Sequence, residues 1–225
     1  MAPCYRWFAL LLLVPALPLP AAEDTHYNRI RFQVEVTETV ANDRMLAVLA
    51  AETEAASADA AAGTINRTMG WALDQARGVE GVEVGTGAYR ITPVYRKDRP
   101  ERWRGLQELR LEGGDFEVLG RLIGTLQERL QIKHTGFFIA DATREAVESR
   151  LIDRAIERFQ QRAERIRQRF GAQTYHLVEA SLNTSGSRPS PLRMQAMIES
   201  AAATPALEGG QGEVSVGVNG MIELE

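Results

Sequence analysis

The sequence predicts an α+β fold, in which mixed but mainly antiparallel sheets pack against three helices and the C-terminal strand returns to a sheet. Several segments carry apolar residues on every second position, which indicates strands with one buried face. Three others carry apolar residues three or four positions apart, which indicates amphipathic helices. The strands come mainly in adjacent pairs instead of alternating strictly with helices, and this order favours antiparallel sheets.

The first two strands are expected over residues 29–40, which alternate between apolar and polar positions, and residues 45–51, which are more uniformly apolar. Residues 41–43 have the composition of a turn, so these two strands are predicted to pair as a hairpin. An alanine-rich helix is expected next, from a cap at Ser57 to a stop at Gly78.

A second pair of strands is expected over residues 82–95 and 103–113. The side-chain phase of the first strand flips across residues 85–87, which predicts a bulge, and Pro93 places this strand at a sheet edge. The two strands are predicted to pair antiparallel on either side of a charged loop.

Four further elements complete the helices and the middle strands. A helix is expected over residues 115–130, with its first residue as the cap, and a short strand over residues 133–140. A long helix over residues 142–170 is predicted to stop at Gly171, and a strand over residues 174–182 follows it.

The last expected elements are a flexible loop over residues 185–212 and a terminal strand over residues 213–224, whose apolar face includes Val214, Val216 and Val218. Such a strand can pair inside its own sheet or with the sheet edge of another protomer. We favour its own sheet. Because the second route stays open, the three valines are candidate partner-contacting residues.

The N-terminal segment predicts export. Residues 1–22 place Arg6 before an apolar run that ends in small residues, which is the layout of a signal peptide. We expect cleavage near Ala21 or Ala22, and a retained N-terminal anchor is the alternative. The mature chain, residues 23–225, is expected to form one domain in the periplasm, with outer-membrane association as a further option. No later stretch of the sequence is long and apolar enough to predict a transmembrane segment.

Composition excludes several kinds of chemistry. The only cysteine, Cys4, lies inside the predicted signal peptide, so the mature chain offers no disulfide, thiol nucleophile or cysteine metal ligand. Without Arg6, the 26 basic residues fall to 25 against 30 acidic residues, which gives a net charge of −5. An acidic exported chain is poorly suited to nucleic acid, and we expect no such partner.

Catalytic and cofactor motifs are missing from the sequence. The three histidines, His26, His134 and His176, do not lie at metal-ligand spacing from one another or from an acidic pair on one helix face. The glycines near residue 80 follow a helix and enter a strand, which is the wrong order for a phosphate-binding loop. We therefore expect no catalytic residues, no metal, no cofactor and no enzymatic activity.

The predicted long helix carries a row of arginines four positions apart, which we call the Arg row. It consists of Arg150, Arg154, Arg158 and Arg162. Like charges at this spacing repel by a few tenths of a kcal/mol per pair. A solvated face with local ion pairs is the simpler interpretation. The alternative is a contact with an acidic surface of a neighbouring subunit or of another envelope protein, which makes these four residues candidate partner-contacting residues.

A second basic cluster surrounds Trp103 in the charged loop and the strand that follows it. Its members are Arg96, Lys97, Arg99, Arg102 and Arg104. A solvated hairpin tip is the simpler interpretation. The alternative is a weak contact with anionic headgroups, at about 1 kcal/mol per basic residue near the surface.

Several segments, in their order along the chain, resemble the SIMPL-domain family of exported bacterial proteins. They are WALDQARGVEGVEV, YRITPVY, WRGLQELRLEGGDFEVLGRLI, AIERFQQRAERIRQRFGA and GEVSVGVNGMIEL. The resemblance implies a periplasmic or outer-membrane-associated protein, assembly into large ring-like oligomers in at least one member, and a link to envelope or oxidative stress. It implies no catalytic residues. Many members have glycine and Pro-Asp in the first hairpin, whereas this chain has VEVTETVAND.

The sequence and the resemblance together favour a non-enzymatic, homo-oligomeric periplasmic protein with a structural or stress-protective role. The alternative is a peptide-binding or chaperone-like envelope module that captures extended segments at a sheet edge. A hydrolase or metal-dependent enzyme of unrecognised type is the third option, and tightly bound metal in the purified protein would revive it.

Overall fold

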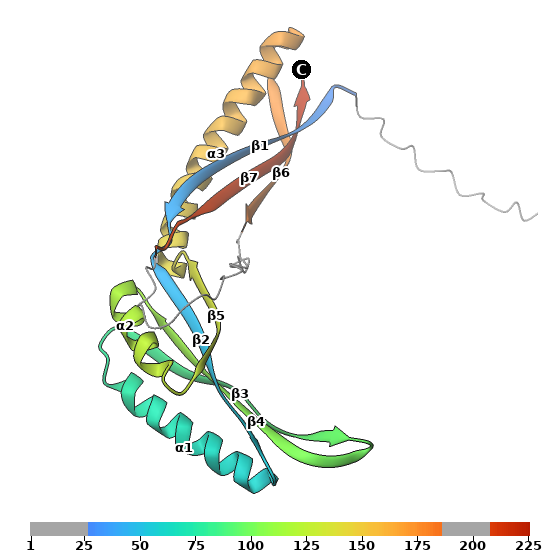
Figure 1. Cartoon of the computed structure of the whole chain (residues 1–225). Helices are drawn as coiled ribbons and strands as arrows, with labels where there is room; N and C mark the ends of the chain where they lie inside the picture. The colour runs from blue at the N-terminus through green and yellow to red at the C-terminus, as the bar shows by residue number, and fades with distance from the viewer. Residues whose placement is uncertain (1–26, 186–207) are drawn as a thin grey trace, which may run out of the picture.

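The chain folds into two antiparallel sheets, each covered on one face by helices, that follow one another along an elongated molecule (Figure 1). The computed structural model describes residues 27–185 and 208–225. Its elements are β1 (Arg29–Ala41), β2 (Arg44–Ala55), α1 (Ala58–Arg77), β3 (Val82–Arg96), β4 (Arg99–Gly113), α2 (Phe116–Leu126), β5 (Gln131–Phe138), α3 (Asp141–Phe170), β6 (Tyr175–Ser185) and β7 (Gln211–Leu224). The predicted α+β class with three helices is confirmed.

The first sheet, which we call sheet A, has the strand order β1-β7-β6. The terminal strand β7 lies at its centre and pairs antiparallel with both neighbours, so the predicted insertion into the chain's own sheet is confirmed. Helix α3 covers one face, and Val147, Leu151, Ala155 and Phe159 pack against the valines of β7. The ring of Phe159 stacks on Phe32 of β1 at 4.4 Å between centroids.

Gly220 of β7 lies directly under this aromatic stack. A Cβ atom at Gly220 would come within 2.5 Å of Phe159 Cζ and within 2.9 Å of the carbonyl oxygen of Glu179. The single gap in the alternating apolar pattern of the terminal strand is therefore the place where a ring from α3 fills the space that a side chain would take.

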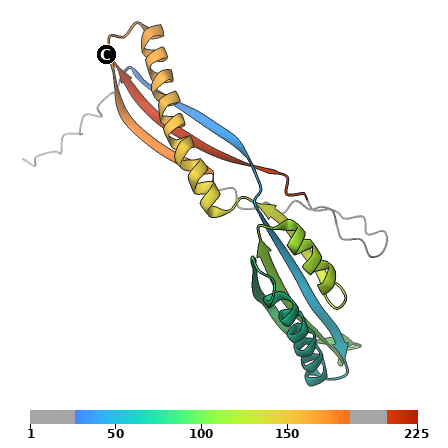
Figure 2. The ribbon, with the colours of Figure 1, turned by 90° about the vertical axis from the view of Figure 1, so that its left-hand side faces the viewer.

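The second sheet, sheet B, has the strand order β3-β4-β2-β5. Helices α1 and α2 lie on the same face of it (Figure 2). Met45 and Leu49 of β2 and Leu109 and Leu111 of β4 form the centre of this core, and each is fully buried. The two sheets therefore have separate apolar cores.

The predicted hairpin between the first two strands is wrong. Strand β1 pairs with β7 in sheet A, whereas β2 pairs with β4 and β5 in sheet B. Asn42 and Asp43 lie where the chain passes from one sheet to the other, and their polar groups bind other crossing segments. Asn42 N–H donates to Gly210 O (3.2 Å), and Asp43 N–H donates to Phe138 O (3.2 Å).

Most of the local signals are confirmed. Ser57 accepts a hydrogen bond from Ala60 N–H at the start of α1, and Asp115 accepts one from Val118 N–H at the start of α2. Gly171 ends α3 with a φ of 71°, in the left-handed region that favours glycine. The register of β3 against β4 shifts between Thr86 and Tyr89, where the bulge was predicted.

Two boundaries differ from prediction. Helix α2 ends at Leu126 instead of residue 130, and the charged loop between β3 and β4 shrinks to a two-residue turn. Phe170, the last residue of α3, is largely exposed, and the end of α3 extends past the strands of sheet A (Figure 1). The predicted signal peptide and residues 186–207 of the predicted flexible loop lie outside the described residues.

Candidate interaction surfaces

The start of α3 is fixed by a residue from a distant segment. Ala140 at the N-cap has no capping side chain of its own. Instead Asp43 accepts hydrogen bonds from Ala140 N–H (2.6 Å) and from the hydroxyl of Thr143 (2.5 Å). Partial burial alone would raise the pKa of Asp43, but these hydrogen bonds outweigh it and hold the pKa below its ordinary value. Asp43 therefore ties α3 to the crossing between the two sheets.

The end of α3 is held by Arg167. Its guanidinium binds Glu164 (2.6 Å) and donates to the carbonyl oxygens of Ala172 (2.8 Å) and Gln173 (3.1 Å), which lead into β6. Arg167, followed by the amide of Gln168, lowers the pKa of Glu164 to about 2. With Asp43 at one end and Arg167 at the other, the path of α3 across sheet A is set.

This path brings α3 over β7 and β1 much more than over β6. The Arg row faces β1. Arg150 and Arg154 both bind Glu38 of β1, at 2.9 and 3.0 Å, and Arg162 donates to Gln33 O of β1 (2.9 Å). Three of the four predicted candidates are therefore brought together on one strand of their own chain, where they cover its edge.

Arg158 differs from the other members of the Arg row. Among residues 27–185 and 208–225 its guanidinium has no ion pair. An open hollow of about 610 Å³ lies beside the row, between the end of β1 and the first turns of α3, with Glu38 and Arg150 among its lining residues. The hollow is open to solvent. The charge of Glu38 at its wall is neutralised by the ion pair with Arg150.

Strand β6 forms the other edge of sheet A, and its helix-facing side is uncovered. Leu177 lies opposite Ile222, and Leu182 lies opposite Val218. These two β7 residues are buried, whereas Leu177 is 57% exposed and Leu182 is 50% exposed. Because directly opposite residues share a face, the core of sheet A continues onto β6 as an apolar row that nothing in the described structure covers.

A bulge at Val178 creates this row. The register against β7 shifts between Leu177 and Glu179. Leu177 and Leu182 are five positions apart, so in a regular strand they would point to opposite faces. The extra residue restores the phase and places both leucines on the helix side. Val178 itself is also exposed.

Helix α3 extends the apolar surface on the same side. Successive helix residues are about 100° apart around the axis. Arg154, one position before the buried Ala155, reaches β1, so Ile156, one position after it, faces the β6 side. Ile156 is 38% exposed. We call the surface made by Leu177, Val178, Leu182 and Ile156 the β6 surface.

The sequence reasoning missed the β6 surface. It predicted the strand over residues 174–182 but assigned no role to its apolar residues. The available signal was the sequence Leu177-Val178-Glu179-Ala180-Ser181-Leu182, in which the apolar residues do not fall on every second position. Such a break predicts a bulge, although it does not predict that the helix leans away from the strand.

Val214, Val216 and Val218 lie in the core of sheet A, and each is almost fully buried. In the described fold they contact α3 and the flanking strands of their own chain. A partner would reach them only if β7 left the centre of the sheet. Their assignment as partner-contacting residues stays a prediction.

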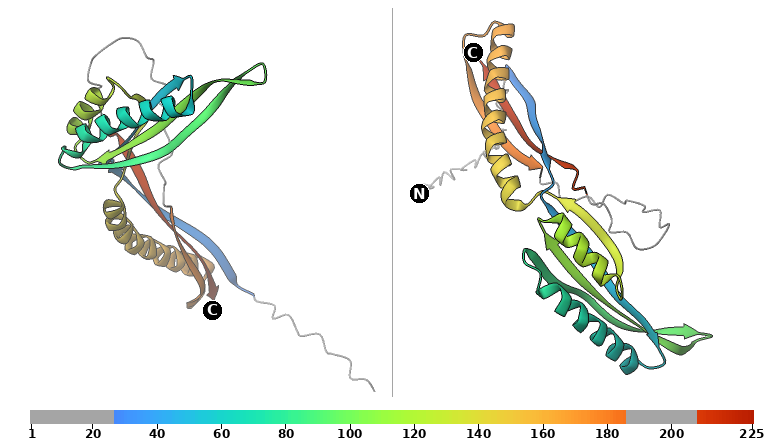
Figure 3. Two further views of the ribbon diagram at one scale, coloured as in Figure 1. Left: turned by 90° about the horizontal axis from the view of Figure 1, so that it is seen from below. Right: turned by 60° about the vertical axis from the view of Figure 1, so that its left-hand side comes forward.

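The hairpin of β3 and β4 projects from sheet B past the end of β2 (Figure 3). Ala55, the last residue of β2, pairs with Trp103 of β4, and Trp103 pairs in turn with Pro93 of β3. Beyond this level, residues 94–102 form a two-stranded ribbon, which we call the arm tip. Its turn consists of Lys97 and Asp98, whose φ angles of 47° and 61° are both left-handed.

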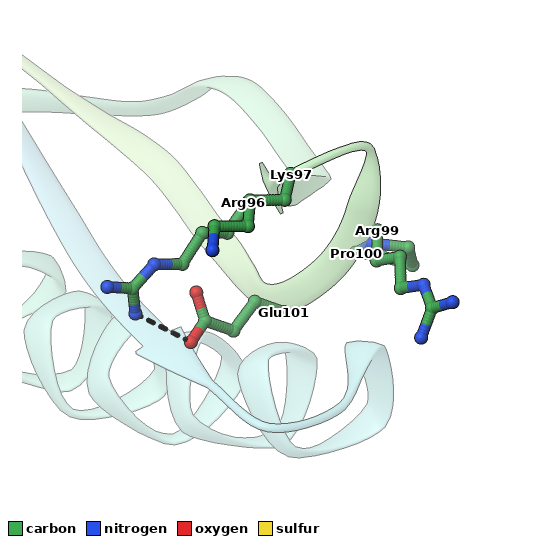
Figure 4. A pocket seen from close by; sticks show the side chains of 5 residues that line it. All are labelled: Arg96, Lys97, Arg99, Pro100 and Glu101. Carbon is green, nitrogen blue, oxygen red and sulfur yellow. Dashed lines mark hydrogen bonds and ion pairs between the residues drawn. The ribbon is translucent and has the colours of Figure 1, made fainter.

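The arm tip carries most of the second basic cluster. Arg96 binds Glu101 at 3.2 Å, while Arg99 points away from this pair (Figure 4). An open hollow of about 600 Å³ lies among these side chains. At the base of the arm, Arg104 binds Glu54 of β2 at 2.8 Å.

The described residues hold no group of three or more metal-ligating side chains that could bind an ion. His176 lies 3.1 Å from a carboxylate oxygen of Glu225, and His134 lies on β5 opposite Val48. No helix within residues 27–185 and 208–225 is both long and apolar enough to cross a membrane.

A search of the curated proteins found no match to this chain. A family model does match residues 30–222, from the second residue of β1 to a position two residues before the end of β7. Its description is "SIMPL: Protein of unknown function (DUF541)". The match spans both sheets and all three helices, which agrees with the resemblance seen in the sequence. The chain therefore belongs to the SIMPL (DUF541) family.

Proposed function

We propose that this chain is a non-enzymatic, exported periplasmic protein that assembles with copies of itself through the β6 surface, in a structural or envelope-stress-protective role. The observation that carries the proposal is the uncovered apolar row on an edge strand, Leu177 and Leu182, which continues the core of sheet A. The signal peptide predicted over residues 1–22 and the resemblance to exported family members support the location.

A second copy fits the β6 edge because antiparallel pairing of a strand with itself is symmetric. A two-fold axis perpendicular to the sheet keeps the helix-facing sides of both copies on one side. The two leucine rows then meet, and the two three-stranded sheets become one. Such a contact satisfies the free backbone groups of β6 and covers Leu177 and Leu182 together.

The charges of β6 do not oppose this pairing. Edge strands that must stay single usually carry lysine, proline or inward-pointing charges. Glu179 is instead bound to Arg31 of β1 (3.2 Å) on the outer face, and His176 lies beside Glu225. A bulge such as the one at Val178 normally discourages pairing, but here it aligns the two leucines on one face.

The test is the native mass of residues 23–225, measured by light scattering over a concentration series. The wild type is expected to form a discrete oligomer, and Leu182→Lys is expected to shift it to a smaller species. Thr37→Lys is the matched control, because it adds the same charge to the exposed outer face of β1 in the same sheet. A wild type that stays monomeric, or a Leu182→Lys oligomer of unchanged mass, would contradict the proposal.

The Arg row is proposed as a secondary contact in the same assembly. Arg158, which lacks an ion pair within the described residues, is the member that an acidic surface of a neighbouring subunit would bind. Arg158→Glu should then reduce the highest assembly state and leave the β6-mediated species intact. A mass distribution identical to that of the wild type would remove the Arg row from the interface.

The second candidate function, capture of extended peptides, is favoured by the same free edge. A peptide strand that adds to β6 would take its backbone partners there and place alternate apolar side chains on Leu177 and Leu182. Under this alternative the chain is monomeric at every concentration, binds extended apolar peptides in fluorescence anisotropy, and loses that binding in Leu182→Lys. Peptide binding by an intact oligomer would count against it, because the β6 edge is then already paired.

A further inference from the structure

We propose that the arm tip, residues 94–102, is a docking site for an anionic lipid bilayer surface, which it binds through phosphate-bearing headgroups. This surface lies on sheet B and is separate from the β6 surface of sheet A (Figure 1). The inference does not depend on assembly, so it stands or falls independently of the proposed function.

The arm tip projects beyond the rest of sheet B, so a partner could contact it without contacting the body of the sheet. Past the pairing of Ala55 with Trp103, no third strand of the described chain joins the ribbon, and neither helix of sheet B extends along it (Figure 3). An isolated two-stranded ribbon is marginally stable in water. A long ribbon that projects without a core under it is therefore best explained by a contact at its tip.

The charge of the arm tip is opposite to that of the chain. Residues 94–102 contain four basic and two acidic residues, while the whole chain has a net charge of −4. The tip is therefore +2 and the remainder −6. Lys97, Arg99 and Arg102 have no ion pair within the described residues. The molecule thus presents a positive pole that can orient it toward an anionic surface.

The internal geometry of the tip also favours an anion between its cations. Arg96 pairs directly opposite Arg99 across the turn, and like charges in that position destabilise a ribbon. The turn between them has two left-handed residues, of which Lys97 is a residue type that rarely adopts this conformation. Phosphate oxygens in the open hollow beside Arg96, Lys97 and Arg99 would relieve the repulsion.

The aromatic residue of the tip points to a lipid surface instead of an acidic protein. Tyr95 is 64% exposed, next to the cations, and tyrosine is enriched at membrane interfaces, where its ring meets the headgroup level. The projecting shape suits a broad surface better than a groove. The hollow beside the Arg row is a poor acidic partner for the tip of a second copy, because Arg150 lines it together with Glu38.

The experiment measures partitioning of residues 23–225 onto phosphatidylglycerol vesicles and phosphatidylcholine vesicles by flotation. We expect binding to the anionic vesicles that weakens as salt is raised. Each basic residue near such a surface contributes about fivefold, so Lys97→Asn combined with Arg99→Gln should lower the partition coefficient about 25-fold. Asparagine tolerates the left-handed conformation, which keeps the turn intact.

The matched control is Arg165→Gln combined with Arg169→Gln. These exposed residues lie at the far end of α3, have no ion pair within the described residues, and their removal changes the net charge by the same amount. The control should bind almost as the wild type does. Equal loss in both variants would show a non-specific charge effect and overturn the proposal, as would equal binding to neutral vesicles. Cross-linking of the tip to another copy without vesicle binding would favour a protein partner and also overturn it.

A second readout follows the tip directly. Tyr95→Trp places a fluorophore beside the cations, and its emission should shift to shorter wavelength when anionic vesicles are added. An emission spectrum that is unchanged at saturating anionic lipid would place Tyr95 away from the bilayer and contradict the proposed orientation.

Discussion

The two edges of sheet A are protected very differently by the same helix. On the β1 side, α3 sends Arg150 and Arg154 to Glu38 and Arg162 to a backbone carbonyl of the edge strand. On the β6 side, α3 turns Ile156 toward a strand whose leucines remain half exposed. Within residues 27–185 and 208–225, long cationic side chains close one edge, whereas the other edge is open and apolar.

The difference shows where a partner is expected. A free sheet edge that carries an exposed row of apolar side chains tends to pair with another strand. An edge whose polar groups are bound by arginines is protected from such pairing. The Arg row, which looks like the most distinctive charged feature in the sequence, therefore has a role inside the chain. The plainer strand TYHLVEASL carries the free surface.

The largest expected effect comes from truncating the two partners of one cross-strand pair. Ile222 is fully buried and Leu177, directly opposite, is 57% exposed. Ile222→Ala should lower the free energy of unfolding by about 2–5 kcal/mol, because it leaves a cavity under α3. Leu177→Ala should change it by less than about 0.5 kcal/mol. Urea denaturation of both variants, at a concentration where all chains are monomeric, measures the difference.

A comparable loss in the two variants would show that Leu177 is buried in the monomer. That outcome would remove the contrast between the strands and, with it, the apolar row on which the proposed assembly rests. Leu109→Ala in the core of sheet B serves as the reference for a fully buried leucine and should resemble Ile222→Ala.

The next effect concerns Asp43, which sets the path of α3 and so decides which edge the helix covers. Asp43→Ala removes the acceptor of Ala140 N–H and of the Thr143 hydroxyl and should lower the free energy of unfolding by about 1–2 kcal/mol. Hydrogen exchange should speed up at the start of α3 and along β1. Faster exchange confined to β6 would mean that Asp43 does not control the position of the helix.

The pH dependence of stability has the sign expected for a carboxyl with a lowered pKa. The contribution of Asp43 is present above its unfolded value of 3.8 and is lost as the pH falls through the lower folded pKa. The wild type and Asp43→Asn should therefore differ most near neutral pH and converge in acid. Urea midpoints measured from neutral pH into the acid range below 3.8 would show the difference shrink, and a constant difference would exclude this carboxylate as the cause.

Local structure could be predicted from the sequence because its signals are local. Ser57, Asp115 and Gly171 are read correctly since a cap binds or adapts to the backbone of its own helix. The alternation of Val214 to Leu224 is read correctly because it reports a buried face, whichever strand lies beside it.

Long-range relations could not be predicted in the same way. Residues 41–43 have the composition of a turn, which predicted a hairpin. In the structure Asn42 and Asp43 instead bind segments near positions 210 and 140, and the chain passes from one sheet to the other. The exposure of Leu177 depends on the angle at which α3 crosses the sheet, which is set by Asp43 and Arg167. The roles of the Arg row likewise follow from the proximity of β1, and no spacing within the helix contains that information.

The smallest expected effect is that of Glu38→Gln, which releases Arg150 and Arg154 from the β1 edge. Exposed ion pairs contribute about 0–1 kcal/mol, so the free energy of unfolding should fall by no more than this, and less at high salt. Amide exchange along β1 should nevertheless rise, because the edge loses its cover. If the released Arg150 and Arg154 bind no other chain, the native mass of Glu38→Gln should equal that of the wild type. A larger oligomer in Glu38→Gln than in the wild type would show that an acidic partner surface competes with Glu38 for the Arg row, which would give both edges of sheet A a part in assembly.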